Sequence, residues 1–115
     1  MTIFLEDSFD AAHFLPNVPM GHKCRTMHGH TYRIRIEVTG EVDPTLGWVM
    51  DYAAIKEVWL NIKSELDHMN LNDSFKNPTC EKIVAWIGNE LKDEIPGTSR
   101  VELRETVNCG VVYIP

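Results

Sequence analysis

Apolar and polar side chains alternate along two segments of the N-terminal third of the chain, which is the pattern of half-buried strands. The first segment covers residues 2–15, with an irregularity expected near residues 11–12, and the second covers residues 28–39. Apolar residues occupy alternate positions at the end of the second segment, so this parity is expected to face the core. Residues 16–27, with two prolines and a glycine, are predicted to form a long loop between the strands.

The middle of the chain has the three-to-four-residue apolar spacing of amphipathic helices. One helix is predicted to begin after Asp51, a favourable N-cap, and to run to about Leu66. The second is predicted to begin near residues 77–79, Asn-Pro-Thr, and to stop before Pro96. Two starts of this helix are possible. Either Asn77 is the N-cap and Pro78 is the first helical residue, or Thr79 is the N-cap.

The C-terminal part predicts a hairpin, with a strand over 99–107, a tight turn at 108–110 and a strand over 111–114. The resulting order is ββααββ. Hairpins before and after a helical pair predict an α+β fold, in which a four-stranded antiparallel sheet carries two helices packed on one face. A chain of 115 residues is expected to form a single domain over residues 1–115.

Composition narrows the classes of function. The net charge of −6 and the absence of a long basic run argue against a nucleic-acid surface. No apolar run approaches the roughly 18 residues of a membrane span. Three cysteines without an export signal fit a reducing, cytoplasmic setting.

Three histidines share the apolar parity of the two predicted strands. His28 and His30 lie on the core-facing side of the second strand, and His13 is in phase with the apolar positions of the first. A buried imidazole without a partner is costly, so three of them indicate a common partner. Neutral imidazoles suit Zn²⁺ and leave a fourth position for water or substrate. The alternative is that they are ordinary core or surface histidines.

Cys24 lies in the predicted loop, four residues before His28. Three interpretations stay open for it. First, it could be a fourth ligand that closes a structural zinc site. Second, it could be a base beside the metal, because a nearby cation favours the thiolate. Third, it could be a passive loop residue. Cys80 and Cys109 are expected to be ordinary small residues.

Two further positions carry candidate acid/base or binding groups. Asp67 and His68 end the first predicted helix, where they are either plain polar residues or a pair in which the carboxylate sets the imidazole tautomer for proton transfer. Glu105 shares the parity of Val101 and Leu103. It is therefore either exposed at a strand end or aimed into a pocket, where it would accept two parallel hydrogen bonds from a guanine-like or pterin-like ring edge.

In order along nearly the whole chain, these residues resemble the 6-pyruvoyltetrahydropterin synthase family. The matching segments are Phe9-Asp10-Ala11-Ala12-His13, Gly21-His22-Lys23-Cys24, His28-Gly29-His30, Leu66-Asp67-His68, Leu71-Asn72, Asn77-Pro78-Thr79 and Glu105-Thr106. The three-residue gap between Cys24 and His28 is most similar to the bacterial branch, the 6-carboxy-5,6,7,8-tetrahydropterin synthases of the queuosine pathway.

The resemblance implies the tunnelling fold, in which subunits assemble into ring-like oligomers, usually a homohexamer built as a dimer of trimers, with the pocket between subunits. It also implies a role for each candidate: zinc binding for His13, His28 and His30, the base for Cys24, acid/base chemistry for Asp67 and His68, and pterin anchoring for Glu105.

The implied reaction converts 7,8-dihydroneopterin triphosphate to 6-carboxy-5,6,7,8-tetrahydropterin, acetaldehyde and triphosphate. Three alternatives stay open: triphosphate elimination by a 6-pyruvoyltetrahydropterin synthase on the same substrate, a non-catalytic zinc-stabilised module, and a simple pterin or purine binder.

Overall fold

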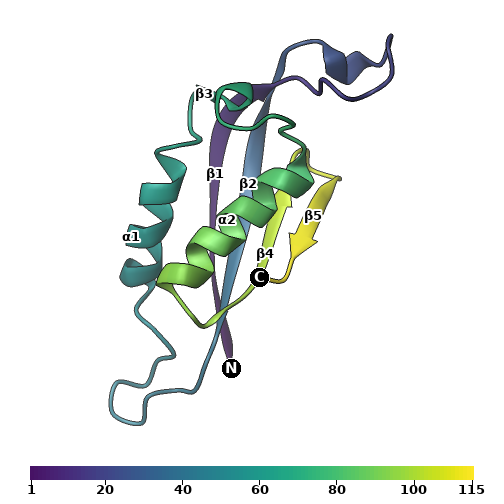
Figure 1. The fold of residues 1–115 in the computed structure, drawn as a ribbon. Helices are drawn as coiled ribbons and strands as arrows, with labels where there is room; N and C mark the ends of the chain where they lie inside the picture. The colour runs from purple at the N-terminus through teal and green to yellow at the C-terminus, as the bar shows by residue number, and fades with distance from the viewer.

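Two twelve-residue strands, β1 (Thr2–His13) and β2 (His28–Thr39), form the centre of the fold in a computed structural model that describes all residues 1–115. The remaining elements are α1 (Tyr52–Lys63), β3 (Met69–Asn70), α2 (Cys80–Glu94), β4 (Thr98–Arg104), β5 (Gly110–Tyr113) and the short 3-10 helices η1 (Lys23–Arg25) and η2 (Leu71–Asp73). Both long helices cover the same face of the sheet (Figure 1).

The sheet has the strand order β3-β1-β2-β4-β5. The predicted α+β class, with helices on one face, is confirmed, but the predicted count of four antiparallel strands is wrong. A fifth strand, β3, pairs in parallel with β1 through Ala11–Met69 and Ala12–Asn70. This two-residue strand comes from a polar loop, and so short a segment has no periodicity from which to predict it.

Each long helix begins directly after a residue whose side chain accepts a hydrogen bond from a main-chain N–H of the first turn. Asp51 accepts a hydrogen bond from the Ala53 N–H at 2.8 Å and caps α1. Of the two starts left open for α2, the structure selects Thr79, whose hydroxyl accepts from the Lys82 N–H. The predicted end of α1 at Leu66 is three residues too late, although Leu66 still belongs to the core.

Strand β4 also ends three residues earlier than predicted, at Arg104. The next residues turn back, and the Glu105 N–H donates to the Cys109 carbonyl at 3.1 Å. Val107, the last residue of the predicted strand, is 71% exposed. Glu105 therefore belongs to a turn, and its direction is set by that turn instead of by strand alternation.

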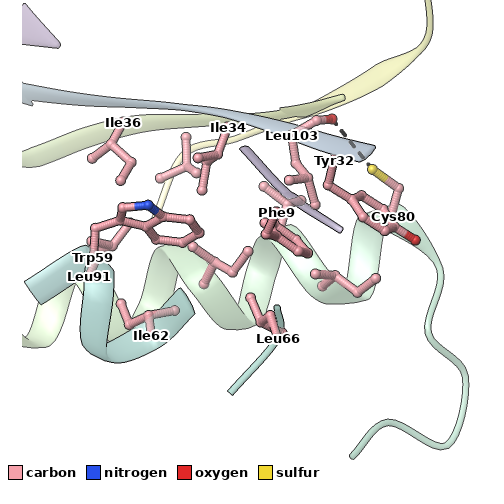
Figure 2. Packing of buried hydrophobic residues seen from close by; sticks show 14 of the residues in the cluster. Phe9, Tyr32, Ile34, Ile36, Trp59, Ile62, Leu66, Cys80, Leu91 and Leu103 are labelled. Atoms are coloured by element: carbon pink, nitrogen blue, oxygen red, sulfur yellow. Dashed lines mark hydrogen bonds between the residues drawn. The ribbon is translucent and has the colours of Figure 1, made fainter. Parts of the chain in front are cut away.

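The core lies between the sheet and the two helices and contains 19 buried residues. Figure 2 shows Ile34, Ile36 and Leu103 of the sheet directed toward the helices. The Phe9 and Tyr32 rings stack with centroids 4.9 Å apart. Beyond these rings, toward the end of the β1–β2 pair, the positions that face the same side of the sheet are occupied by histidines instead of aliphatic residues.

Residues 14–27 extend as a loop beyond the paired ends of β1 and β2 (Figure 1). No helix in the structure combines the length and the apolar character needed to cross a membrane.

Candidate metal centre and acid/base pair

Strand pairing brings the three histidines together. The β1–β2 ladder runs without a shift from Thr2–Thr39 to His13–His28, so the irregularity expected near residues 11–12 is absent from this pairing. His13 faces His28 directly, and His30 lies two residues further along β2 on the same side of the sheet. One ring nitrogen from each histidine lies within 4.8 Å of the other two.

Carbonyl groups fix the orientation of two of these rings. His13 Nδ1 lies 2.7 Å from the Pro78 carbonyl, and His28 Nδ1 lies 2.7 Å from the Thr26 carbonyl. A carbonyl oxygen only accepts, so each Nδ1 carries the proton and donates. In the neutral rings both Nε2 atoms therefore present lone pairs to each other, 3.0 Å apart. Two acceptors at that distance need a shared cation, either a proton or a metal ion.

His30 completes the group. Its Nε2 is buried and has no hydrogen-bond partner. Burial lowers the pKa of His30 below its ordinary value, although the nearby Glu105 carboxylate opposes this effect. The neutral ring is the ligating form. Tetrahedral zinc ligands at about 2.0–2.1 Å lie about 3.3–3.4 Å from one another, so these three nitrogens fit Zn²⁺ with small ring movements.

Glu105 and Tyr32 border this centre. Glu105 Oε1 lies 3.4 Å from His13 Nε2 and 3.7 Å from His30 Nε2. The Tyr32 hydroxyl lies 3.3 Å from His13 Nδ1, and burial raises the pKa of this phenol, which stays protonated. The sequence placed Glu105 at a pocket or a strand end, and the structure places its half-buried carboxylate beside the histidines.

Asp67 and His68 lie together in the turn between α1 and β3. His68 Nδ1 is 3.1 Å from Asp67 Oδ1. The main-chain N–H of Asp10 donates to the same oxygen at 3.0 Å, and this bond is the main reason why the pKa of Asp67 is lowered. His68 has a φ of 61°, the only positive φ outside glycine, and its N–H donates to the Asp10 carbonyl at 2.6 Å. This left-handed conformation is uncommon for a side chain with a Cβ and is held by the bond to β1.

Asp10 was not among the candidates from the sequence. Its side chain accepts from the Thr31 hydroxyl, and one of its oxygens lies within 4.8 Å of both Asp67 and His68. The sequence did indicate the direction of the Asp10 side chain, because Asp10 and His13 are three residues apart on one strand and so face opposite sides of the sheet. The carbonyls of Pro78 and Thr26 were also missed, and main-chain groups have no sequence signature.

Cys24 lies in η1, in the loop beyond the strand ends, and is half-buried. Its main chain bonds to Leu15 and His22, but its sulfur is not a member of the three-histidine group. Within one chain, the structure therefore brings the histidines and Glu105 together and leaves Cys24 apart from them. Cys80 is buried, its thiol donates to the Leu103 carbonyl, and burial raises its pKa to about 12 (Figure 2). Cys109 is exposed.

Two hollows adjoin these groups. A shallow groove of about 560 Å³ is lined by His30 from the histidine group, by His68 from the acid/base pair and by Asp10. A second hollow of about 350 Å³ is lined by Glu105, Cys80 and Thr79, among others. Both volumes are in the range of small-ligand sites, roughly 300–1,000 Å³.

Comparison with known proteins shows which proteins this chain is similar to. Residues 2–115 match the family model of 6-pyruvoyl tetrahydropterin synthase. The chain is 40% identical to a 6-carboxy-5,6,7,8-tetrahydropterin synthase of Synechocystis, over 96% of this chain and 91% of that protein. It is 37% identical to a dihydroneopterin monophosphate aldolase of Pyrococcus furiosus, over 95% of this chain and 93% of that protein. The solved structure of 6-pyruvoyl tetrahydropterin synthase from Caenorhabditis elegans superposes with a TM-score of 0.91 at 28% identity, covering 100% of this chain and 95% of that one.

Proposed function

Because this chain belongs to the 6-pyruvoyl tetrahydropterin synthase family, we propose that it is a zinc-dependent lyase acting on a pterin. The proposed reaction converts 7,8-dihydroneopterin triphosphate and one water molecule to 6-carboxy-5,6,7,8-tetrahydropterin, acetaldehyde and triphosphate, as a step of queuosine biosynthesis. Support for this product comes from the 40% identity to the Synechocystis synthase over most of both chains.

The observation that carries the proposal is the convergence of acceptors on one point. The Nε2 atoms of His13 and His28 face each other, the Nε2 of His30 has no partner, and a Glu105 oxygen lies beside them. A protein does not bury such a group without a compensating cation. Three nitrogen ligands with a free fourth position are typical of catalytic zinc.

The roles of the side chains follow from this centre. His13, His28 and His30 hold the ion. A bound zinc ion supplies Lewis acidity to the substrate oxygen at which negative charge develops.

The remaining groups handle protons and the ring. The Cys24 thiolate takes a proton from the substrate side chain. His68, oriented by Asp67, returns or removes protons, and each acid or base contributes about 10²–10⁴ in rate. The Glu105 carboxylate accepts hydrogen bonds from the N–H groups of the pterin ring, which the hollow lined by Thr79 and Cys80 would hold.

We also propose that the active form is a ring-like oligomer, a homohexamer. The outer edge of β1 has β3 as a partner only at residues 11–12, and β5 pairs only with β4. Two open edges on one sheet favour pairing with further copies of the chain. Assembly would bring Cys24, which lies apart from the histidines of its own chain, to a site shared between subunits. A cytoplasmic location stays a prediction from cysteine usage.

Incubation of the purified zinc-loaded protein with 7,8-dihydroneopterin triphosphate tests the function. We expect acetaldehyde and 6-carboxytetrahydropterin in equal amounts. Release of triphosphate with a 6-pyruvoyl product would contradict the proposed reaction and assign the activity of the Caenorhabditis elegans relative. Turnover of dihydroneopterin monophosphate alone would assign that of the Pyrococcus relative.

The Cys24→Ala variant separates the enzyme from a zinc-stabilised module. We expect it to keep its zinc and fold and to lose turnover, whereas Met20→Ala, which truncates an exposed side chain of the same loop, keeps all three. Loss of zinc from Cys24→Ala would mean that the sulfur is a ligand and that the site is closed.

A further inference from the structure

Asp10 holds the Asp67–His68 turn against β1 with both of its main-chain groups. Its N–H donates to Asp67 Oδ1 at 3.0 Å, and its carbonyl accepts from the His68 N–H at 2.6 Å. These bonds point away from β2, so they use an edge of β1 that the β1–β2 ladder leaves free. The adjacent pairing of β3 with residues 11–12 continues the same attachment.

The side chain of Asp10 is held by a residue of β2, the strand on the opposite side of β1 from the turn. Asp10 lies opposite Thr31 in the β1–β2 register, and the Thr31 hydroxyl donates to Asp10 Oδ1. The hydroxyl therefore holds the Asp10 carboxylate in place. One oxygen of this carboxylate lies within 4.8 Å of an Asp67 carboxylate oxygen and of a His68 ring nitrogen. Asp10, Thr31 and His68 also line the groove that contains His30, whereas Asp67 does not.

The His68 ring needs such support because its own surroundings provide little. Its side chain is 79% exposed, and the only side-chain partner in hydrogen-bond range is the Asp67 carboxylate, 3.1 Å from Nδ1. An exposed imidazole with one contact samples several orientations, and proton transfer requires a ring held in one geometry and one tautomer.

We propose that Asp10 is a positioning residue for His68: its tethered carboxylate, together with Asp67, confines the ring and keeps the proton of the neutral imidazole on Nδ1. The far nitrogen, Nε2, is then the atom available to exchange a proton with a substrate. This inference rests on the proposed function for its catalytic consequence, but the state of the ring is measurable without any substrate.

The test compares Asp10→Asn with Asp10→Glu. Asparagine keeps the size of the side chain and an acceptor for Thr31 but removes the charge, while glutamate keeps the charge. Glu6→Gln is the matched control, since it removes one carboxylate from the same face of β1 and its partner is Arg35 instead of His68.

The first readout is the tautomer of His68, measured by ¹⁵N NMR of histidine-labelled protein at a pH where the ring is neutral. We expect the Nδ1–H form to dominate in the parent protein and in Glu6→Gln and to lose share in Asp10→Asn. An unchanged tautomer ratio in Asp10→Asn overturns the proposal. Because no substrate is present, this result stands even when the pterin activity is absent.

The second readout is steady-state kinetics on the pterin triphosphate. We expect kcat to fall about tenfold in Asp10→Asn, a fraction of the effect of losing His68 itself, with KM changed less than about twofold. Asp10→Glu should retain more of kcat than Asp10→Asn. The reverse order, or equal kcat in the parent and Asp10→Asn, overturns the positioning role, whereas no turnover in the parent contradicts the proposed function alone.

Discussion

Buried polar side chains divide into those that find a partner within this chain and those that do not. The buried Cys80 thiol donates to the Leu103 carbonyl. His30 Nε2 is buried without a partner. An unsatisfied buried acceptor costs about 1–3 kcal/mol, and an ion bound at His30 would offset this cost. The three histidines could be found from sequence because strand parity alone gave their direction.

Replacement of His30 by alanine tests its role as a ligand. We expect zinc affinity to fall by at least about 100-fold, because losing only an outer-sphere partner costs about 10–100-fold. Competition with a zinc chelator measures this change. His22→Ala, which changes an exposed histidine outside the group, should keep the parent affinity. Equal affinities of the two variants would contradict a ligand role for His30.

At the scale of elements, the start of α2 and the metal centre are linked through two consecutive residues. Thr79 caps α2, and the preceding Pro78 supplies the carbonyl that orients His13. The N-cap was recognisable in the sequence, but the carbonyl contact was not, because residues 13 and 78 meet only through the packing of α2 on the sheet. The strand before Glu105 was predicted three residues too long for a similar reason, since the end of a strand depends on the turn that follows.

The Thr79→Ala variant separates these two contributions. Loss of the cap should cost about 1 kcal/mol of unfolding free energy, measured by denaturant titration. We expect zinc affinity to fall about tenfold as well, because the Pro78 carbonyl loses its fixed position. Asp51→Ala removes the equivalent cap from α1 and should lower stability without changing zinc affinity. Equal zinc affinity in both variants would contradict the link between α2 and the metal centre.

Asp7 connects α1 to β1 and makes stability depend on pH. Partial burial opposes ionisation, but hydrogen bonds from Trp59, the Ser8 main chain and Lys63 hold the pKa of Asp7 below its ordinary 3.8. A lowered carboxylate pKa stabilises the fold above the unfolded-state value, and this contribution is lost as pH falls through the folded-state value.

We therefore expect Asp7→Asn to be less stable than the parent at pH 7, by about 1–2 kcal/mol, and the difference to shrink below about pH 4. Denaturant titrations of the metal-free protein across that range measure it. A difference that stays constant from pH 7 to pH 2 would contradict the ionic role of Asp7.

At the scale of the whole molecule, the sequence predicted the fold class, the helical pair on one face and the meeting of three histidines at one end of the sheet. It could not predict β3, Asp10 or the separation of Cys24 from the histidines within one chain. These features arise from main-chain pairing and loop paths, which leave no periodic pattern. Within one chain, the outer edge of β1 has a partner strand only at residues 11–12, and the outer edge of β5 has none.

Phe4→Pro tests whether the β1 edge assembles. The Asp10 main chain points away from β2, so the N–H groups of even-numbered residues of β1 point to the same free edge. Proline at position 4 removes one such donor without removing a ladder bond. We expect Phe4→Pro to sediment as a smaller species than the parent, while Phe4→Ala, which also loses the contact of the ring with Arg35, keeps the parent size. Equal sizes of parent and Phe4→Pro would contradict assembly through this edge.

X-ray absorption spectroscopy of the purified protein at the zinc edge tests whether three imidazoles hold an open zinc site. We expect one zinc per chain with nitrogen and oxygen neighbours at about 2.0–2.1 Å and no sulfur. A scatterer at about 2.3 Å, the distance of a thiolate ligand, or the absence of zinc after incubation with the metal would contradict it.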